Sequence, residues 1–344
     1  MIAKSAPLGT KPTPSIEVAL GTFNSERFLP ELLDSLFAQT YQAFTLIVAD
    51  DGSVDSTFEI LARYMERYLG RIKIVGRGGA RPLGPSGNFS RLLELATADY
   101  LLLCDHDDVW LPNKVALSLE RMLEFEGRHG PDTPLLVHTD LVVVGPALEV
   151  LGPSFFRYSG VDPAQNHLTR LLTRNVVTGC ASIMNRSLYE RARPIPPEAS
   201  MHDRWLALVA AALGSIEVID QPTILYRQHG GNVIGAKARA PALMRRIRKT
   251  LFSRDGQRMI MRYSDQAATL LDRYGDQMPA DLRRPTETLA HLWSFSRWRR
   301  FFRLRRSGVG FRGLMRNAAL LIVVTRGGRR NRRAGRQKQD SRNG

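Results

Sequence analysis

The chain has 344 residues, of which 43% are hydrophobic and 24% are charged, and these values are typical of a globular protein with a buried core. Its two cysteines, Cys104 and Cys180, lie in apolar stretches without metal-type spacing, which argues against a disulfide framework and favours a reduced, cytosolic protein. We expect no secretory signal, because the first residues lack an apolar segment, and no apolar run approaches the ~20 residues that span a bilayer.

The first 110 residues alternate between short apolar runs and amphipathic segments. The pattern predicts strands at 16–20, 44–49, 72–75 and 100–104, and helices near 28–37, 56–68 and 88–96. This rhythm, with continuously apolar strands, predicts a parallel sheet covered by helices on both faces. Ligands of such sheets bind beyond the carboxyl ends of the strands.

Acidic residues follow two of these strands directly. Asp105, Asp107 and Asp108 come after 100–104. Carboxylates so close together repel one another unless a cation neutralises them, and their oxygen atoms suit Mg²⁺ or Mn²⁺. The alternative is that Asp107 or Asp108 caps a following helix near Pro112.

The other acidic pair, Asp50 and Asp51, ends the strand at 44–49. Such residues are ordinary choices for a strand-to-helix turn. The functional alternative is a carboxylate that accepts the ring N–H of a uracil or thymine base.

Two later segments carry further candidate side chains. Asp203 lies in the first turn of a predicted helix, where it is either a cap favoured by the helix dipole or a general base. The segment 226–232 places Arg227, Gln228 and His229 beside two glycines, which suits a loop folding over phosphates. A purely structural His229 is the alternative.

Taken in order, these segments resemble the family 2 glycosyltransferases, which have the GT-A fold, over about residues 14–236. The motifs that carry the resemblance are Val18–Asn24, Gln39–Tyr41, Ile47–Ser53, Cys104–Trp110 and Asn175–Cys180. Two later motifs, His202–Trp205 and Tyr226–His229, resemble a bacterial branch described as rhamnosyltransferase-like.

The resemblance implies an α/β GT-A fold with a mainly parallel sheet, helices on both faces and, in this chain, a basic helical C-terminal extension. It implies an inverting, metal-dependent transfer of one sugar from dTDP-rhamnose or a UDP-sugar to a glycan or lipid-linked glycan in surface polysaccharide synthesis. Two departures are His202, where the family commonly has Glu, and the lack of a clear QxxRW motif, which favours transfer of a single sugar over processive synthesis.

The resemblance also implies roles for individual residues. Asp203 matches the catalytic base, and Asp105 and Asp107 match the ligands of Mg²⁺ or Mn²⁺. The nucleotide-binding positions are Thr22, Phe23, Asn24, Asp50, Asp51 and Asn88. The donor diphosphate is assigned to Arg227, Gln228 and His229.

The net charge of +16 is concentrated in the last third of the chain. Residues 1–240 carry 23 basic and 26 acidic groups, whereas residues 241–344 carry 26 basic and 7 acidic groups. We expect a flexible N-terminus (1–13), a catalytic domain (14–240), a basic and aromatic helical extension (241–325) and a disordered basic tail (326–344).

Aromatic residues alternate with arginines in the segment 291–306, as in a helix that lies among lipid headgroups. We therefore expect a cytoplasmic protein on the inner face of the cell membrane, with an anionic membrane surface as a partner. The alternatives are that Trp293 and Trp298 pack on the catalytic domain, that the chain is an inactive GT-A scaffold, or that it is a basic membrane- or nucleic-acid-binding protein. No nucleic-acid-binding signature is present, so nucleic acid is not an expected partner.

Overall fold

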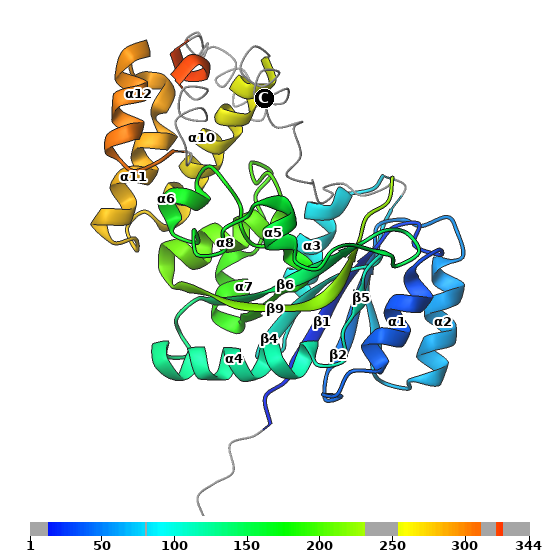
Figure 1. The fold of residues 1–344 in the computed structure, drawn as a ribbon. Coiled ribbons are helices and arrows are strands. Elements are labelled where there is room, and N and C mark those ends of the chain that lie inside the picture. Colours follow the sequence, from blue (N-terminus) through cyan, green and yellow to red (C-terminus); the bar gives the residue numbers. More distant parts are fainter. Residues whose placement is uncertain (1–12, 80, 231–253, 311–320, 326–344) are drawn as a thin grey trace, which may run out of the picture.

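The computed structural model describes residues 13–79, 81–230, 254–310 and 321–325 (Figure 1). The expected flexible N-terminus, apart from residue 13, and the expected disordered tail at 326–344 lie outside the described residues.

Nine strands of the described residues form one sheet in the order β3-β2-β1-β4-β8-β6-β9-β5, with β7 paired to β6. They are β1 (Ile16–Thr22), β2 (Thr45–Asp50), β3 (Ile72–Arg77), β4 (Tyr100–Asp105), β5 (Val109–Trp110), β6 (Leu135–Val144), β7 (Val150–Gly152), β8 (Ser182–Asn185) and β9 (Ser215–Arg227).

The helices of the first two-thirds of the chain connect these strands. They are α1 (Leu29–Phe37), α2 (Thr57–Arg67), α3 (Gly84–Leu95), α4 (Lys114–His129), α5 (Phe155–Ser159), α6 (Leu168–Leu171), α7 (Arg186–Ala192) and α8 (His202–Leu213). Beyond them lie α10 (Arg254–Tyr274), α11 (Ala280–Ala290) and α12 (Arg297–Arg306), and short 3-10 turns occupy Gly179–Ala181 and Leu292–Ser294.

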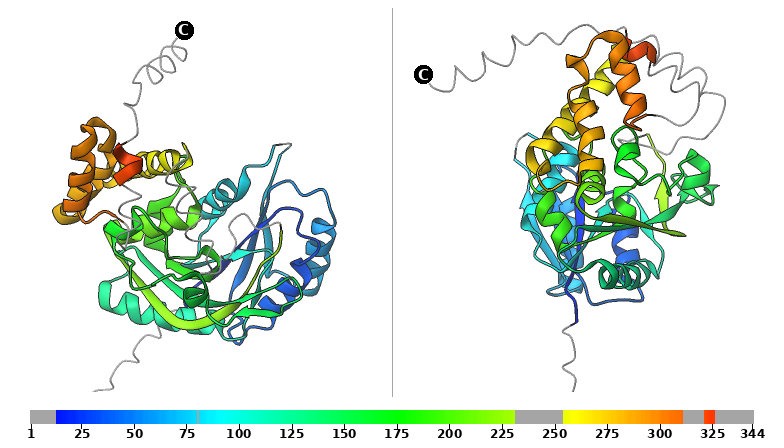
Figure 2. Two further views of the ribbon diagram at one scale, coloured as in Figure 1. Left: turned by 45° about the horizontal axis from the view of Figure 1, so that its top comes forward. Right: turned by 90° about the vertical axis from the view of Figure 1, so that its left-hand side faces the viewer.

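Strands β1 to β4 run parallel to one another, as the sequence predicts, and β6 and β9 are also parallel. The sequence did not predict β8, which inserts antiparallel between β4 and β6. The sheet curls around its long axis (Figure 2). The mainly parallel α/β architecture is confirmed.

The two faces of the sheet bury two separate hydrophobic clusters, because successive side chains of a strand point to opposite faces. Val18 and Leu20 pack with α1, α2 and α4 on one face, whereas Ala19 packs with α3, α7 and α8 on the other. Helices therefore cover both faces, which explains why the parallel strands are apolar without alternation.

The C-terminal helices α10, α11 and α12 continue the second cluster and stand on the side of the sheet away from α1 and α2 (Figure 1). Trp205 of α8 lies 6.3 Å from Tyr274 of α10 between ring centroids, and the backbone N–H of Ser200 donates to Gln266 over 3.0 Å. Helix α10 is thus packed against α8 and the residues just before it.

Within this extension the two tryptophans behave differently. Trp293 belongs to the buried cluster, whereas Trp298 of α12 is 67% exposed. Trp293 is therefore packed within the protein, where the Arg300 guanidinium lies 4.9 Å from its ring centroid, and Trp298 faces solvent. Among the described residues, no helix is both long and apolar enough to cross a bilayer.

Candidate active site

The candidate site lies where β1, β2 and β4 end side by side. Pairing in register brings Gly21 opposite Asp105 and Thr22 opposite Asp50, so both acidic clusters reach the same edge of the sheet. The topology, with parallel strands of similar length, therefore collects side chains that are more than 80 residues apart in sequence.

Asp50 organises the loop after β2. Its carboxylate is fully buried and accepts hydrogen bonds from the Thr22 hydroxyl (2.8 Å), from the backbone N–H groups of Gly52 (2.9 Å) and Ser53 (2.7 Å), and from the Ser53 hydroxyl. The side chains of Thr22 and Asp50 therefore hold the ends of β1 and β2 in place.

Asp51 joins the same loop to the start of α3. Its two oxygen atoms accept the backbone N–H groups of Leu83 (2.8 Å) and Gly84 (2.7 Å), where the helix N-terminus favours a negative charge. Each carboxylate oxygen has a second lone pair, so the side chain retains capacity to accept a further N–H donor.

Asn24, Phe23 and Asn88 complete the edge around these aspartates. The Asn24 backbone N–H donates to the Ser53 hydroxyl (2.8 Å), and its side-chain oxygen accepts from Val54, 3.0 Å away. The Phe23 ring is 43% exposed and open to a stacking partner. Asn88 donates to the Ala49 carbonyl (2.7 Å), while its buried side-chain oxygen has no hydrogen-bond partner among the described residues.

The end of β4 carries the candidate metal ligands. Loss of solvent, together with the nearby carboxylates of Asp107 and Asp203, raises the pKa of Asp105 to about 7. Mutual repulsion of this kind would be relieved by a cation, so the oxygen-rich set fits Mg²⁺ or Mn²⁺. Oxygen atoms of Asp105 and Asp108 and the sulfur atom of Cys180 also lie within 4.8 Å of one another.

His229 and Asp107 are in direct contact. The imidazole Nε2 lies 2.8 Å from Asp107 Oδ2, and the ring rests against Phe28 with centroids 4.9 Å apart. The loop after β9 therefore reaches one of the candidate metal ligands. Gln228 itself donates to the Arg227 carbonyl over 3.0 Å.

Arg227 lies beneath this loop with 1% of its surface exposed. Its guanidinium donates to the Asp107 carbonyl (2.8 Å), to the Pro146 carbonyl and to the Glu31 carboxylate, and it stacks over Phe28 at 4.4 Å. The guanidinium is thus engaged within the protein, and it fixes the backbone of the acidic loop from below.

Asp108 is fully buried, and one of its oxygen atoms accepts the backbone N–H of Arg227 over 3.1 Å. It caps no helix, because α4 begins only at Lys114 after an N-cap at Asn113. Burial and the neighbouring carboxylates raise the pKa of Asp108 well above its usual range. The alternative of a capping Asp108 is therefore wrong.

Lys114 is buried below this cluster, where its ammonium group has no hydrogen-bond partner among the described residues and lies 4.5 Å from the centroid of Trp110. Burial lowers its pKa to about 8, although Cys180, Cys104 and Asp108 nearby favour its charged form. A cation in this position offsets part of the negative charge collected above it.

Asp203 faces the metal-ligand end of β4 from the first turn of α8. Loss of solvent raises its pKa to about 6, opposed by hydrogen bonds from the backbone of Arg204 and Gly179 and from the side chain of Asn175. A carboxylate with such a pKa, ionised at neutral pH yet poorly solvated, is suited to accept a proton.

The backbone of Gly179 approaches this carboxylate closely. A Cβ atom at Gly179 would lie 2.9 Å from His202 Nε2 and 3.3 Å from the Asp203 Cβ. Glycine at this position therefore permits the contact that holds the carboxylate. The sequence shows Asn175 and Gly179 only as parts of a motif and gives no sign of this contact.

His202, which replaces the expected Glu, is buried and stacks on Phe89 of α3 with centroids 4.0 Å apart. Burial lowers its pKa to about 3, so the ring is neutral at physiological pH. It adds no charge beside Asp203 and instead anchors α8 to α3.

Comparison with known proteins agrees with this architecture. Residues 17–137 match the model of glycosyl transferase family 2. The chain is 34% identical to EpsE of Bacillus subtilis over 116 residues, 34% of this chain and 40% of that protein. It is 26% identical to the dTDP-rhamnosyl transferase RfbG of Shigella flexneri over 241 residues, 66% of this chain and 78% of that protein.

Among solved structures, the fold is similar to S. aureus TarS 1–349 in complex with UDP-GlcNAc, with a TM-score of 0.50 and 17% identity over 92% of this chain and 93% of that one. At this identity the likeness concerns the fold alone. The chain spans only two fifths of the length of EpsE. The family match and the sequence relatives together place residues 17–137 of this chain in glycosyl transferase family 2.

Proposed function

We propose that this transferase moves a single sugar, with inversion, from a nucleotide-diphosphate donor to a hydroxyl group of a glycan or lipid-linked glycan in surface polysaccharide synthesis. The observation that carries the proposal is that Asp107 and Asp203 both lie close enough to Asp105 at the edge of the sheet for their charges to raise its pKa. One carboxylate outside a metal-binding pair is what an inverting displacement requires.

In the proposed reaction Asp203 accepts the proton of the acceptor hydroxyl as that oxygen attacks the anomeric carbon. The bond from the anomeric carbon to the nucleotide diphosphate breaks on the opposite face. Asn175 and Gly179 hold the Asp203 carboxylate in position. Removing general-base catalysis typically lowers the rate ~10²–10⁴-fold.

The donor would lie across the ends of β1 and β2. We propose that Asp51 accepts the ring N–H of a uracil or thymine base, that Phe23 stacks on this base, and that the free oxygen of Asn88 faces the nucleotide. Thr22, Asn24 and Asp50 then shape the loop that surrounds it. Since RfbG carries the name of a dTDP-rhamnosyl transferase, dTDP-rhamnose is the first donor to test, followed by UDP-sugars.

Mg²⁺ or Mn²⁺ held by Asp105 and Asp107 would neutralise the charge that develops on the departing diphosphate. Gln228 and His229 are placed to close over the same group, because His229 already reaches Asp107. For Arg227 we propose a positioning role in place of direct contact with the diphosphate, since its guanidinium is buried against the acidic loop.

We further propose that the protein works at the cytoplasmic face of the membrane. Helix α12 supports this proposal: Trp298 and Phe302 are 67% and 59% exposed, and the helix contains six arginines but no acidic residue. Exposed aromatic side chains among arginines favour the interfacial region of an anionic bilayer.

The decisive experiment is a thermal-shift panel of UDP, dTDP, GDP and CMP, each with Mn²⁺, Mg²⁺ or EDTA. A nucleotide at about 100 times its dissociation constant should raise the free energy of unfolding by ~2.7 kcal/mol. We expect a shift with UDP or dTDP that requires metal and disappears in Asp107→Ala. The control variant is Asp276→Ala, at a fully exposed position beyond α10.

If no nucleotide produced a thermal shift in either the wild type or the control variant, the proposed donor site would be contradicted. The inactive GT-A scaffold would then become the better description. A shift that persists in Asp107→Ala would contradict the metal assignment alone.

A further inference from the structure

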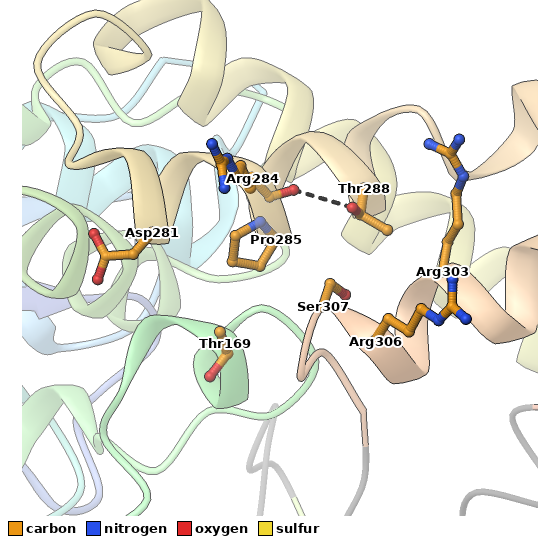
Figure 3. A pocket seen from close by; sticks show the side chains of 8 residues that line it. All are labelled: Thr169, Asp281, Arg284, Pro285, Thr288, Arg303, Arg306 and Ser307. Atoms are coloured by element: carbon orange, nitrogen blue, oxygen red, sulfur yellow. Dashed lines mark hydrogen bonds between the residues drawn. The ribbon is translucent and has the colours of Figure 1, made fainter.

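A pocket separate from the catalytic edge opens among the C-terminal helices. It lies between α6, α11 and α12 and has a volume of about 510 Å³ (Figure 3). It is lined by Thr169, Asp281, Arg284, Pro285, Thr288, Arg303, Arg306 and Ser307. This volume lies within the range of sites that hold small organic ligands.

The walls of the pocket are fixed by buried contacts. Arg170 and Thr173, at the end of α6, donate to the Gly310 carbonyl beyond α12, each over 3.3 Å. Arg300 of α12 is 2% exposed and donates to the Phe295 carbonyl (3.0 Å) and the Val324 carbonyl (3.0 Å). These bonds hold α6 and α12 in place, so the pocket is part of the folded structure.

The lining is strongly cationic. Arg284, Arg303 and Arg306 line it together with a single carboxylate, that of Asp281, and the Arg303 guanidinium also lies 4.3 Å from the centroid of the Phe295 ring (Figure 3). In the part of the chain that the structure describes, none of these three arginines forms an ion pair. Guanidinium groups without an ion pair around one cavity favour an anionic ligand.

The hydroxyl groups of the pocket already donate hydrogen bonds within the protein. Thr288 already donates to the Arg284 carbonyl (3.0 Å) and Ser307 to the Leu304 carbonyl (2.8 Å). The guanidinium groups therefore remain as the principal hydrogen-bond donors. Their planar fork matches the oxygen atoms of a phosphate group.

The surface beside the pocket is apolar. Trp298, Phe302 and Arg306 follow one another at intervals of four residues on α12, so they form one line along the helix. The two aromatic rings are exposed, and the third member of the line, Arg306, lines the pocket. A ligand with a phosphate group next to an acyl region would match both parts at once.

We propose that the α6–α11–α12 pocket binds a phosphate ester, with Arg284, Arg303 and Arg306 as its ligands, and that the ester is the headgroup of a lipid whose chains meet Trp298 and Phe302. This inference names the residues behind the proposed membrane association. It does not depend on sugar transfer, and its test measures binding alone.

The test compares the full-length protein with two double variants. Arg284→Gln/Arg306→Gln removes two pocket charges, and Arg299→Gln/Arg305→Gln removes two exposed charges of α12 outside the pocket. Binding to vesicles of phosphatidylcholine with and without phosphatidylglycerol is measured by sedimentation. Thermal shift with glycerol 1-phosphate and inorganic phosphate, at constant ionic strength, measures binding of the free group.

We expect the pocket variant to bind phosphatidylglycerol vesicles at least about fivefold more weakly than the control variant, because it loses directed contacts as well as charge. Glycerol 1-phosphate should stabilise the wild type and the control but not the pocket variant. The charge-conserving Arg306→Lys should also weaken binding, since lysine lacks the guanidinium fork.

These measurements distinguish a lipid headgroup from a free phosphate as the ligand of the pocket. Pocket-dependent shifts with inorganic phosphate, together with equal vesicle binding by both double variants, would support the site but assign it to a free phosphate. Equal losses by both double variants with every probe would overturn the proposal, because the attraction would then be unspecific. Turnover with a soluble acceptor, measured in parallel, reports separately on the proposed transferase function.

Discussion

The carboxyl edge of the sheet and helix α12 each collect charge of one sign, but they hold it by different means. At the edge, Asp50, Asp51 and Asp108 are buried, and each accepts hydrogen bonds from the backbone. On α12, most of the arginines are exposed, and Arg300 is the buried exception. Burial fixes position and shifts pKa values, whereas exposure leaves charge available to a partner surface.

The difference indicates which effects are local and which are collective. A substitution at the carboxyl edge should affect one reacting atom, and its effect on the rate should not depend on the salt concentration. A change on α12 should act through a surface and weaken with salt, because exposed charges are screened beyond ~10 Å at 0.1 M. The predictions below test this separation.

The largest effect is expected for Asp203→Asn. The amide cannot accept the proton of the acceptor, so turnover should fall ~10²–10⁴-fold while donor binding is kept. The measurement is the steady-state rate with a soluble acceptor, together with nucleotide-induced thermal shift. The matched control is Arg299→Gln/Arg305→Gln, which changes the charge of α12 and should leave this rate unchanged.

Near-normal turnover in Asp203→Asn would place the base elsewhere. A comparable loss of turnover in the α12 control would show that the effects of the two regions are not separate. Either result is readable even without the natural acceptor, provided that one soluble acceptor supports measurable transfer.

The second prediction concerns Arg227, whose guanidinium is buried among carbonyl groups. Arg227→Met leaves the carbonyls of Asp107 and Pro146 without their donor, and we expect the free energy of unfolding to fall by about 2–4 kcal/mol. Urea unfolding measures this change. The control is Arg121→Met, whose partners are partly exposed and whose loss should cost less than about 1 kcal/mol.

If Arg227→Met instead kept wild-type stability but lost donor binding, Arg227 would be a diphosphate ligand after all. The positioning role would then be wrong. Equal stability losses in the two variants would show that burial does not distinguish them.

Much of this arrangement follows from the sequence, and the exceptions have a common cause. Strands β1 to β4 and helices α1 to α3 carry strong local periodicity, and the predicted and observed bounds differ by only a few residues. Strand β8 could not be placed, because its four residues pair antiparallel with β4, some 80 residues away, and such pairing has no local signature.

The residues of the candidate site likewise fall into those that the local sequence reveals and those that only the fold reveals. Asp105, Asp107 and Asp203 stood out because they follow a strand or open a helix. Lys114 did not, since a lysine at the start of a helix resembles any exposed side chain, and only the fold buries it. The function of Gly179 likewise depends on a contact with α8 that the motif alone does not reveal.

That contact gives the third prediction, Gly179→Ala. The added methyl group would meet the His202 ring at 2.9 Å and the Asp203 Cβ at 3.3 Å, so the His202 ring and the Asp203 side chain, or α8 with them, must shift by a few tenths of an ångström. Misplacement of a catalytic group can cost up to ~10²-fold, and we expect a loss of roughly ten- to a hundredfold in kcat with little change in donor binding. Rates and thermal shifts of the same preparations measure both quantities.

The control for Gly179→Ala is Gly127→Ala, a position on α4 where an added Cβ meets nothing within 4 Å. It should leave kcat unchanged and stabilise the helix slightly. An unaffected kcat in Gly179→Ala would mean that the site adapts to the methyl group and that the position of Asp203 is less constrained than its neighbours indicate.

The smallest expected effect is that of pH on the wild type. Desolvation raises the pKa of Asp203 to about 6, and only the ionised carboxylate can accept a proton. The ionised fraction therefore falls to about one tenth at pH 5, and kcat should rise roughly tenfold between pH 5 and pH 8 and then level off.

Saturating metal is needed, because protons also compete for Asp105, whose pKa is raised to about 7. Circular dichroism at each pH separates this titration from acid unfolding. His202 cannot produce the same profile, since its pKa is lowered to about 3. A rate that stays constant from pH 5 to pH 8 would contradict the perturbed base and, with it, the view that burial at the sheet edge tunes the chemistry.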